Sequence, residues 1–169
     1  EFFKYLEENV QKILSRDSEA LKHIVRRSCE IKAEVVGIDE KEAGLRAILN
    51  YGHTFGHAIE KLHHYEFSHG IGVSLGMRVA ARLACSIGLM SKEDDERQTA
   101  LLDAYGFPKT VEGVDVDAAW DAMGVDKKVE KDKRVYILPT RIGEVVKKAN
   151  VEESLVKLAW KAILPEVNA

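Results

Sequence analysis

The sequence predicts a mainly α-helical, multi-helical domain with one small β-hairpin near the C-terminus. Three observations support this fold class. Apolar residues recur at helical spacing along most of the 169 residues. Residues that cap or end helices separate these stretches. Near the C-terminus, two short runs rich in β-branched residues flank a turn that contains Pro139 and Gly143. No linker or repeat interrupts residues 1–169, so we expect one domain.

The N-terminal half is expected to form four helices, over residues 1–14, 19–36, 40–62 and 69–88. In residues 1–14 the apolar residues share one face, as a packed amphipathic helix requires, and the fourth stretch is largely apolar. Residues 15–18 supply a break and an N-cap before the second helix, which Gly37 ends. His69 and Gly70 open the fourth helix after an irregular segment.

The C-terminal half is expected to form three helices, over residues 92–105, 116–123 and 152–164, and two strands, over residues 134–138 and 144–148. Ser91 is a favourable N-cap, and three acidic residues follow it in the first turn, where the helix dipole favours negative charge. Gly106 and Gly124 end the first two of these helices.

Composition excludes several classes of function. The net charge is −3 and the basic residues are spread along the chain, so no nucleic-acid surface is expected. No apolar run is long enough to span a membrane, and no signal peptide is visible. Cys29 and Cys85 lie outside any CxxC pair, so we expect buried free thiols in a cytoplasmic protein.

The predicted third helix carries a narrow polar stripe. At about 100° per residue, its polar side chains fall within a sector of about 80°. These are Glu42, Arg46, Asn50, His53, His57 and Glu60. Solvated helix faces carry mostly Lys and Glu, whereas this stripe holds directional donors and potential ligands. Gly52 and Gly56 lie on the opposite, apolar side, where they would let another backbone approach closely.

The histidines of this stripe suggest a metal site. His53 and His57 are four residues apart, a spacing that can serve one metal or one ligand but is common by chance. His69 begins the next helix, so its ring can turn back toward the stripe. Two imidazoles and a carboxylate form a usual catalytic zinc set. The remaining histidines, His23, His63 and His64, are expected on the surface or in loops.

Basic residues near the stripe suggest an anionic ligand. The Arg46 guanidinium beside Asn50 suits a phosphate or a carboxylate. Lys32 is either a surface lysine or a further contact with such a ligand. Lys127 and Lys128 are either solvated in a loop or close over an anionic substrate.

The chain resembles the 3-dehydroquinate synthases, a family of sugar phosphate cyclases. The most diagnostic motif is Gly-His-Thr-Phe-Gly-His-Ala-Ile-Glu at residues 52–60. Three further motifs follow the family pattern in the same order along the chain. They are Glu-Ile-Lys-Ala-Glu-Val-Val at residues 30–36, His-Gly at residues 69–70 and Asp-Lys-Lys at residues 126–128. The resemblance covers nearly the whole chain.

The resemblance implies a reaction and its cofactors. Members of this family convert 3-deoxy-D-arabino-heptulosonate 7-phosphate into 3-dehydroquinate and phosphate in the shikimate pathway of aromatic amino-acid biosynthesis. They use bound NAD for a transient oxidation, and Zn²⁺ or Co²⁺ as a Lewis acid. The family also implies a cytoplasmic homodimer.

The same resemblance implies roles for individual residues. His53 and His69 match metal ligands. His57, Lys32 and Glu42 match catalytic positions, of which His57 handles a proton near the phosphate. Arg46, Asn50, Lys127 and Lys128 match substrate-binding positions, and either Lys127 or Lys128 would meet the substrate carboxylate.

Two departures from the family pattern limit these expectations. The N-terminal NAD-binding domain and a glutamate that is the third metal ligand would lie upstream of Glu1. We therefore expect the isolated chain to bind metal weakly and to be inactive. After His69 and Gly70 most relatives have Glu-Ala-Val, whereas this chain has Ile71, Gly72 and then Val.

Three alternatives remain open. Another sugar phosphate cyclase would share the histidines but would not need the basic pair at residues 127–128. A metal-dependent polyol dehydrogenase would not need the anion grip of Arg46 and Asn50. A non-catalytic helical interaction domain would show His53 and His69 facing bulk water, with no metal between them.

Overall fold

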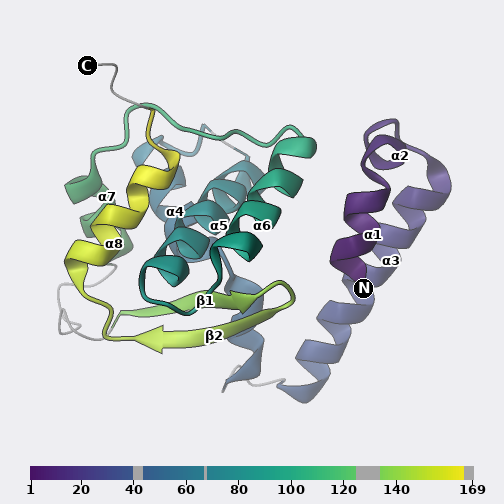
Figure 1. The fold of residues 1–169 in the computed structure, drawn as a ribbon, viewed down its shortest axis with the longest axis horizontal. Coiled ribbons are helices and arrows are strands. Elements are labelled where there is room, and N and C mark those ends of the chain that lie inside the picture. The colour runs from purple at the N-terminus through teal and green to yellow at the C-terminus, as the bar shows by residue number, and fades with distance from the viewer. Residues whose placement is uncertain (40–43, 67, 125–133, 166–169) are drawn as a thin grey trace.

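The computed structural model describes residues 1–39, 44–66, 68–124 and 134–165, and it confirms a mainly helical fold with one antiparallel hairpin (Figure 1). The helices are α1 (Phe2–Glu8), α2 (Val10–Leu14), α3 (Ser18–Ile38), η1 (Leu45–Asn50), α4 (His53–Leu62), α5 (His69–Ser86), α6 (Lys92–Ala104), α7 (Val116–Met123), α8 (Glu153–Ala159) and η3 (Trp160–Ile163), of which η1 and η3 are 3-10 helices. The strands are β1 (Val135–Arg141) and β2 (Glu144–Ala149).

Helices α1, α2 and α3 form an arm beside the body built from α4 to α8 (Figure 1). The Asp17 side chain caps α3 by accepting a hydrogen bond from the Ala20 amide at 2.9 Å. Side chains of α6 and of its C-cap residue attach to α1. Arg97 forms a two-point ion pair with Glu7 at 2.6 and 2.7 Å, and the Tyr105 hydroxyl donates to a backbone carbonyl of α1 at 2.8 Å.

The predicted continuous helix over residues 40–62 is wrong in the described part of that stretch. A 3-10 helix ends at Asn50, and a separate α-helix begins at His53. Gly52 between them adopts a left-handed conformation, with φ of +80°. A Cβ atom at Gly52 would lie only 2.8 Å from the Val73 carbonyl oxygen of α5, so the break allows the chain to pass close to that helix.

Helices α4 and α5 cross at a contact made of glycines. A Cβ atom at Gly56 would lie 2.9 Å from the carbonyl oxygen of Gly72. A Cβ atom at Gly76 would lie 2.1 Å from the carbonyl oxygen of Gly52. The expectation that Gly52 and Gly56 admit a close backbone is therefore confirmed. This close crossing sets how the side chains of the two helices meet.

Aromatic residues hold the hairpin against the helices. The Phe55 ring of α4 stacks on Tyr136 of β1, with centroids 5.7 Å apart, and meets Trp160 of η3 edge-on at 5.6 Å. All three side chains are almost completely buried. Tyr136 of β1 lies opposite Lys148 of β2 in the antiparallel register. Most residues of β1 are buried and those of β2 are not, so β1 is the inner strand and β2 the more exposed one. The core therefore fixes one face of α4.

Smaller differences from the predicted elements occur in the first helix and in the hairpin. The first helix is divided at Asn9, and the strands extend further than expected, with Pro139 inside β1 and the turn at Ile142 and Gly143. Cys29 is exposed, contrary to expectation, because most of α3 is in contact with solvent. Among the described residues, no helix is both long and apolar enough to cross a membrane.

Candidate metal and substrate site

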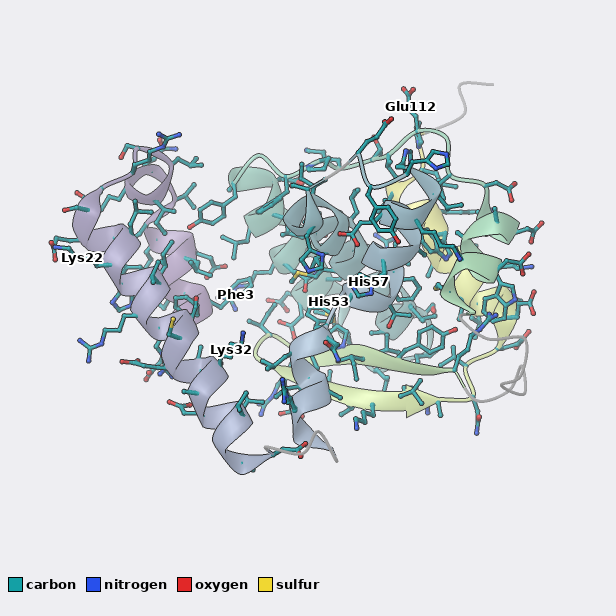
Figure 2. All side chains as sticks on the ribbon, turned by 180° about the vertical axis from the view of Figure 1, so that it is seen from behind. Phe3, Lys22, Lys32, His53, His57 and Glu112 are labelled. Carbon is teal, nitrogen blue, oxygen red and sulfur yellow. The ribbon has the colours of Figure 1, made fainter. Side chains whose placement is uncertain are left out.

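Three histidine rings form a cluster at the start of α4 and α5. The ring centroids of His53 and His57 are 5.5 Å apart, because the two residues are one helical turn apart on α4 (Figure 2). The His69 ring lies 5.1 Å from His53 and 5.7 Å from His57. The structure therefore brings together the three histidines that the sequence singled out.

His69 is held toward α4 by a buried carboxylate. Glu60 Oε1 lies 2.8 Å from His69 Nδ1. The Glu60 side chain is only 8% exposed, whereas that of His69 is 59% exposed. Glu60 lies seven residues after His53, nearly two turns, and so shares its face of the helix. The sequence predicted Glu60 on the polar stripe but gave it no function. Its helical spacing from His53 and His57 was the one feature that could have indicated a place in the site.

The backbone before α4 orients His53. Its Nδ1 atom lies 3.2 Å from the Tyr51 carbonyl oxygen. Tyr51 is itself anchored to α6, because its hydroxyl donates to Gln98 Oε1 at 2.6 Å. Burial raises the pKa of the Tyr51 phenol well above its usual range, so this hydroxyl stays protonated and remains a donor. Tyr51 could not be predicted from the sequence, because no motif marks it.

Replacing Tyr51 with Phe is expected to destabilise the fold by about 1–3 kcal/mol, because the buried Gln98 side chain loses its donor. The measurement is the free energy of unfolding in urea. The matched control is Tyr65→Phe, since Tyr65 is 71% exposed and should tolerate the change. Equal stability of the two variants would contradict the proposed anchor.

The donor atoms of this cluster suit a divalent transition metal. Within the described part of the chain, ligand atoms of His57, Glu60 and His69 lie within 4.8 Å of one another. Both His53 and His69 have Nδ1 next to an oxygen atom, which leaves Nε2 of each ring available. Neutral imidazole nitrogens with a nearby carboxylate are ligands that zinc and cobalt accept. The residues present therefore fit such a metal.

Arg46 and Asn50 do not share an α-helix with these histidines, contrary to the predicted continuous stripe. Both lie on the 3-10 helix η1, where a four-residue spacing separates side chains by about 120° rather than aligning them. Asp39 fixes the start of this segment, because its Oδ2 accepts from the Gly44 amide at 2.7 Å and from the Arg46 amide at 2.9 Å. The segment that carries Arg46 and Asn50 leads into α4 through Tyr51.

Lys32 reaches toward the same region from α3. It is exposed and lines a hollow together with Leu49 of η1, so it lies on the side of α3 that faces η1. Figure 2 shows it between the arm and the body, on the side of the molecule where His53 and His57 lie. The predicted residues Glu42, Lys127 and Lys128 lie outside the described residues. His23 and His64 are exposed, as expected, and His63 is half-buried.

Comparison with protein families and curated proteins places these features among the 3-dehydroquinate synthases. Residues 1–129 match the family model described as 3-dehydroquinate synthase C-terminal. The 3-dehydroquinate synthase of Acetivibrio thermocellus is 46% identical over 158 residues, which is 93% of this chain and 44% of the relative. That of Nostoc punctiforme is 48% identical over 141 residues, covering 82% of this chain and 39% of the relative. The chain thus spans less than half the length of these curated relatives.

Solved structures show the same fold. A 2-deoxy-scyllo-inosose synthase, in complex with carbaglucose-6-phosphate, NAD⁺ and Co²⁺, aligns with a TM-score of 0.64 and 26% identity, over 72% of this chain and 36% of that one. A 2-epi-5-epi-valiolone synthase from Streptomyces hygroscopicus, with NAD⁺ and Zn²⁺ bound, aligns with a TM-score of 0.77 over 92% of this chain and 45% of that one. Its identity is 21%, so this second likeness concerns the fold alone.

Proposed function

Because the chain belongs to the 3-dehydroquinate synthase C-terminal family, we propose that it is the metal- and substrate-binding part of a 3-dehydroquinate synthase. The complete enzyme would convert 3-deoxy-D-arabino-heptulosonate 7-phosphate into 3-dehydroquinate and phosphate in the shikimate pathway. The observation that carries this proposal is the cluster of His53, His57 and His69 at the crossing of α4 and α5.

The relatives favour dehydroquinate synthesis over other cyclase reactions. The identity to curated 3-dehydroquinate synthases is 46% and 48%, against 26% to a 2-deoxy-scyllo-inosose synthase. A substrate with a carboxylate also matches the basic pair Lys127 and Lys128 in the sequence. We assign this pair to the carboxylate of the substrate.

Within this site, His53 and His69 would hold Zn²⁺ or Co²⁺ together with a glutamate from another part of the full-length protein. When bound, such a metal supplies a Lewis acid that polarises oxygen atoms of the substrate. The available Nε2 atoms of the two rings support this assignment, since each Nδ1 lies beside its own oxygen partner.

His57 is proposed to handle a proton near the leaving phosphate. Its ring is exposed and lies beside both His53 and His69, with centroid distances of 5.5 and 5.7 Å. A neutral imidazole carries one donor and one acceptor nitrogen, so it can move a proton at neutral pH. Lys32 and Glu42 would complete the catalytic group.

Arg46 and Asn50 are proposed to bind the anionic part of the substrate. The guanidinium of Arg46 can hold two oxygen atoms of a phosphate at once, and the Asn50 amide can donate a further hydrogen bond. Because η1 leads directly into α4, a substrate bound there would lie next to the histidine cluster.

The rest of the enzyme supplies what this part does not hold. We propose that an N-terminal NAD-binding domain packs against the histidine side of residues 1–169, and that the full-length protein is a cytoplasmic homodimer. The bound NAD would supply reversible oxidation of a ring hydroxyl of the substrate.

Phosphate release by the full-length protein tests this function. Supplied with the heptulosonate phosphate, NAD and Zn²⁺, it is expected to release phosphate and form 3-dehydroquinate. Removing the metal with a chelator should abolish release, and returning Zn²⁺ or Co²⁺ should restore it. Absence of release from the intact, metal-loaded protein would refute the proposal.

A further inference from the structure

The carboxylate of Glu60 is buried although it belongs to an otherwise open site. Its side chain is 8% exposed, and its Oε1 lies 2.8 Å from His69 Nδ1. Burying a carboxylate away from water is costly unless hydrogen bonds compensate it. The contact with His69 is therefore the interaction that can explain why a carboxylate is buried at this position.

The surroundings of Glu60 hold its carboxylate in place. On the side of α5, a Cβ atom at Gly72 would lie 3.0 Å from Glu60 Cγ and 3.2 Å from Oε1. The space left by the missing side chain of Gly72 is therefore occupied by Glu60. With His69 on one side and the backbone of Gly72 on the other, the carboxylate lies between α4 and α5 and has little room to move.

This geometry fixes the state of the His69 ring. An ionised carboxylate only accepts hydrogen bonds, so this contact favours the His69 tautomer whose Nδ1 carries the proton. Nε2 of a neutral ring then carries the lone pair, and the exposed part of the ring presents it to the site. A carboxylate placed behind a histidine in this way orients the ring and increases its basicity as a ligand.

We propose that Glu60 is a positioning residue, which holds His69 in the orientation and tautomer that a divalent metal requires. This inference rests on the proposed function, because it takes Zn²⁺ or Co²⁺ as the metal that His69 binds. Glu60 acts through His69 and does not itself coordinate the ion. Its Oε1 lies 2.8 Å from Nδ1 of His69, whereas Nε2 is the atom of that ring proposed to meet the metal.

The first test needs no metal and no activity. Nitrogen-15 NMR of the histidine rings is expected to show His69 protonated on Nδ1 in the wild-type protein and in Glu60→Gln, whose amide oxygen can still accept the proton. In Glu60→Ala the ring should change toward the Nε2-protonated form. A ring that keeps the same tautomer in all three proteins would overturn the proposal.

The second test is metal affinity of the full-length protein, measured by competition with a chelating dye for Zn²⁺ and by the absorption spectrum of bound Co²⁺. Glu60→Ala should weaken binding by about 10–100-fold, the usual effect of losing such a partner, and Glu60→Gln should weaken it less. The control is Glu66→Ala, which removes an exposed glutamate three residues before His69 and should leave affinity unchanged.

The outcomes separate the two proposals. Equal affinity of the wild-type protein and Glu60→Ala would overturn the positioning function of Glu60. A loss in Glu60→Gln as large as in Glu60→Ala would also overturn it, because the carboxylate would then be a ligand itself. A wild-type protein that binds neither Zn²⁺ nor Co²⁺ would instead refute the proposed function, while the NMR result would still report whether Glu60 holds His69.

Discussion

His53→Ala in the full-length protein is expected to reduce phosphate release by more than about 100-fold. Loss of the proposed metal ligand should cost more than loss of a residue that only orients a ligand. His53 contributes one of the three adjacent rings and has its Nδ1 beside the Tyr51 carbonyl oxygen at 3.2 Å.

The measurement is kcat for phosphate release together with the zinc content of the purified protein. Both should fall, since a missing ligand lowers occupancy as well as turnover. His23→Ala is the control, because His23 is exposed on α3 and its ring contacts Tyr5 at a centroid distance of 3.9 Å rather than the cluster. A His53→Ala enzyme with wild-type turnover would exclude His53 from the site.

Gly76→Ala is expected to destabilise the fold by about 3 kcal/mol or more, at the upper end of what overpacking costs. A Cβ atom at Gly76 would lie 2.1 Å from the Gly52 carbonyl oxygen and 2.6 Å from the Gly56 amide nitrogen. Both neighbours are backbone atoms, which cannot rotate away as a side chain would. Helices α4 and α5 would have to separate.

Thermal unfolding followed by circular dichroism measures this effect, and a loss of this size should lower Tm by about 6–12 °C in a chain of this length. Gly70→Ala is the matched control on the same helix, because nothing lies within 4 Å of a Cβ atom at Gly70. It should leave Tm unchanged or slightly raised. If both variants unfold at the wild-type temperature, the close crossing is not essential.

The same substitution should also affect the site. His53 begins α4 and His69 begins α5, so separating the two helices moves one ring away from the other. Where Gly76→Ala still folds, we expect weaker Zn²⁺ binding than in the wild-type protein. Gly70→Ala tests whether a change next to His69 alone has that effect.

The sequence by itself determined the helical class, the hairpin and the three histidines. Helical periodicity and capping residues are local, and they predicted α7 over Val116–Met123 and the cap at Ser91, whose side chain accepts from the Asp94 amide. The motif at residues 52–60 belongs to one short helix and the turn before it, so His53 and His57 had to share a face.

Only the tertiary structure decided the break before α4 and the place of Glu60. Periodicity predicted a helix running through Gly52, because it is a local pattern and carries no information about α5. A Cβ atom at Gly52 would lie 2.8 Å from a backbone carbonyl oxygen of α5. The contact of Glu60 with His69 likewise depends on two helices that cross at glycines. The candidate site is therefore a product of that crossing, while the histidines proposed as its ligands were already visible in the sequence.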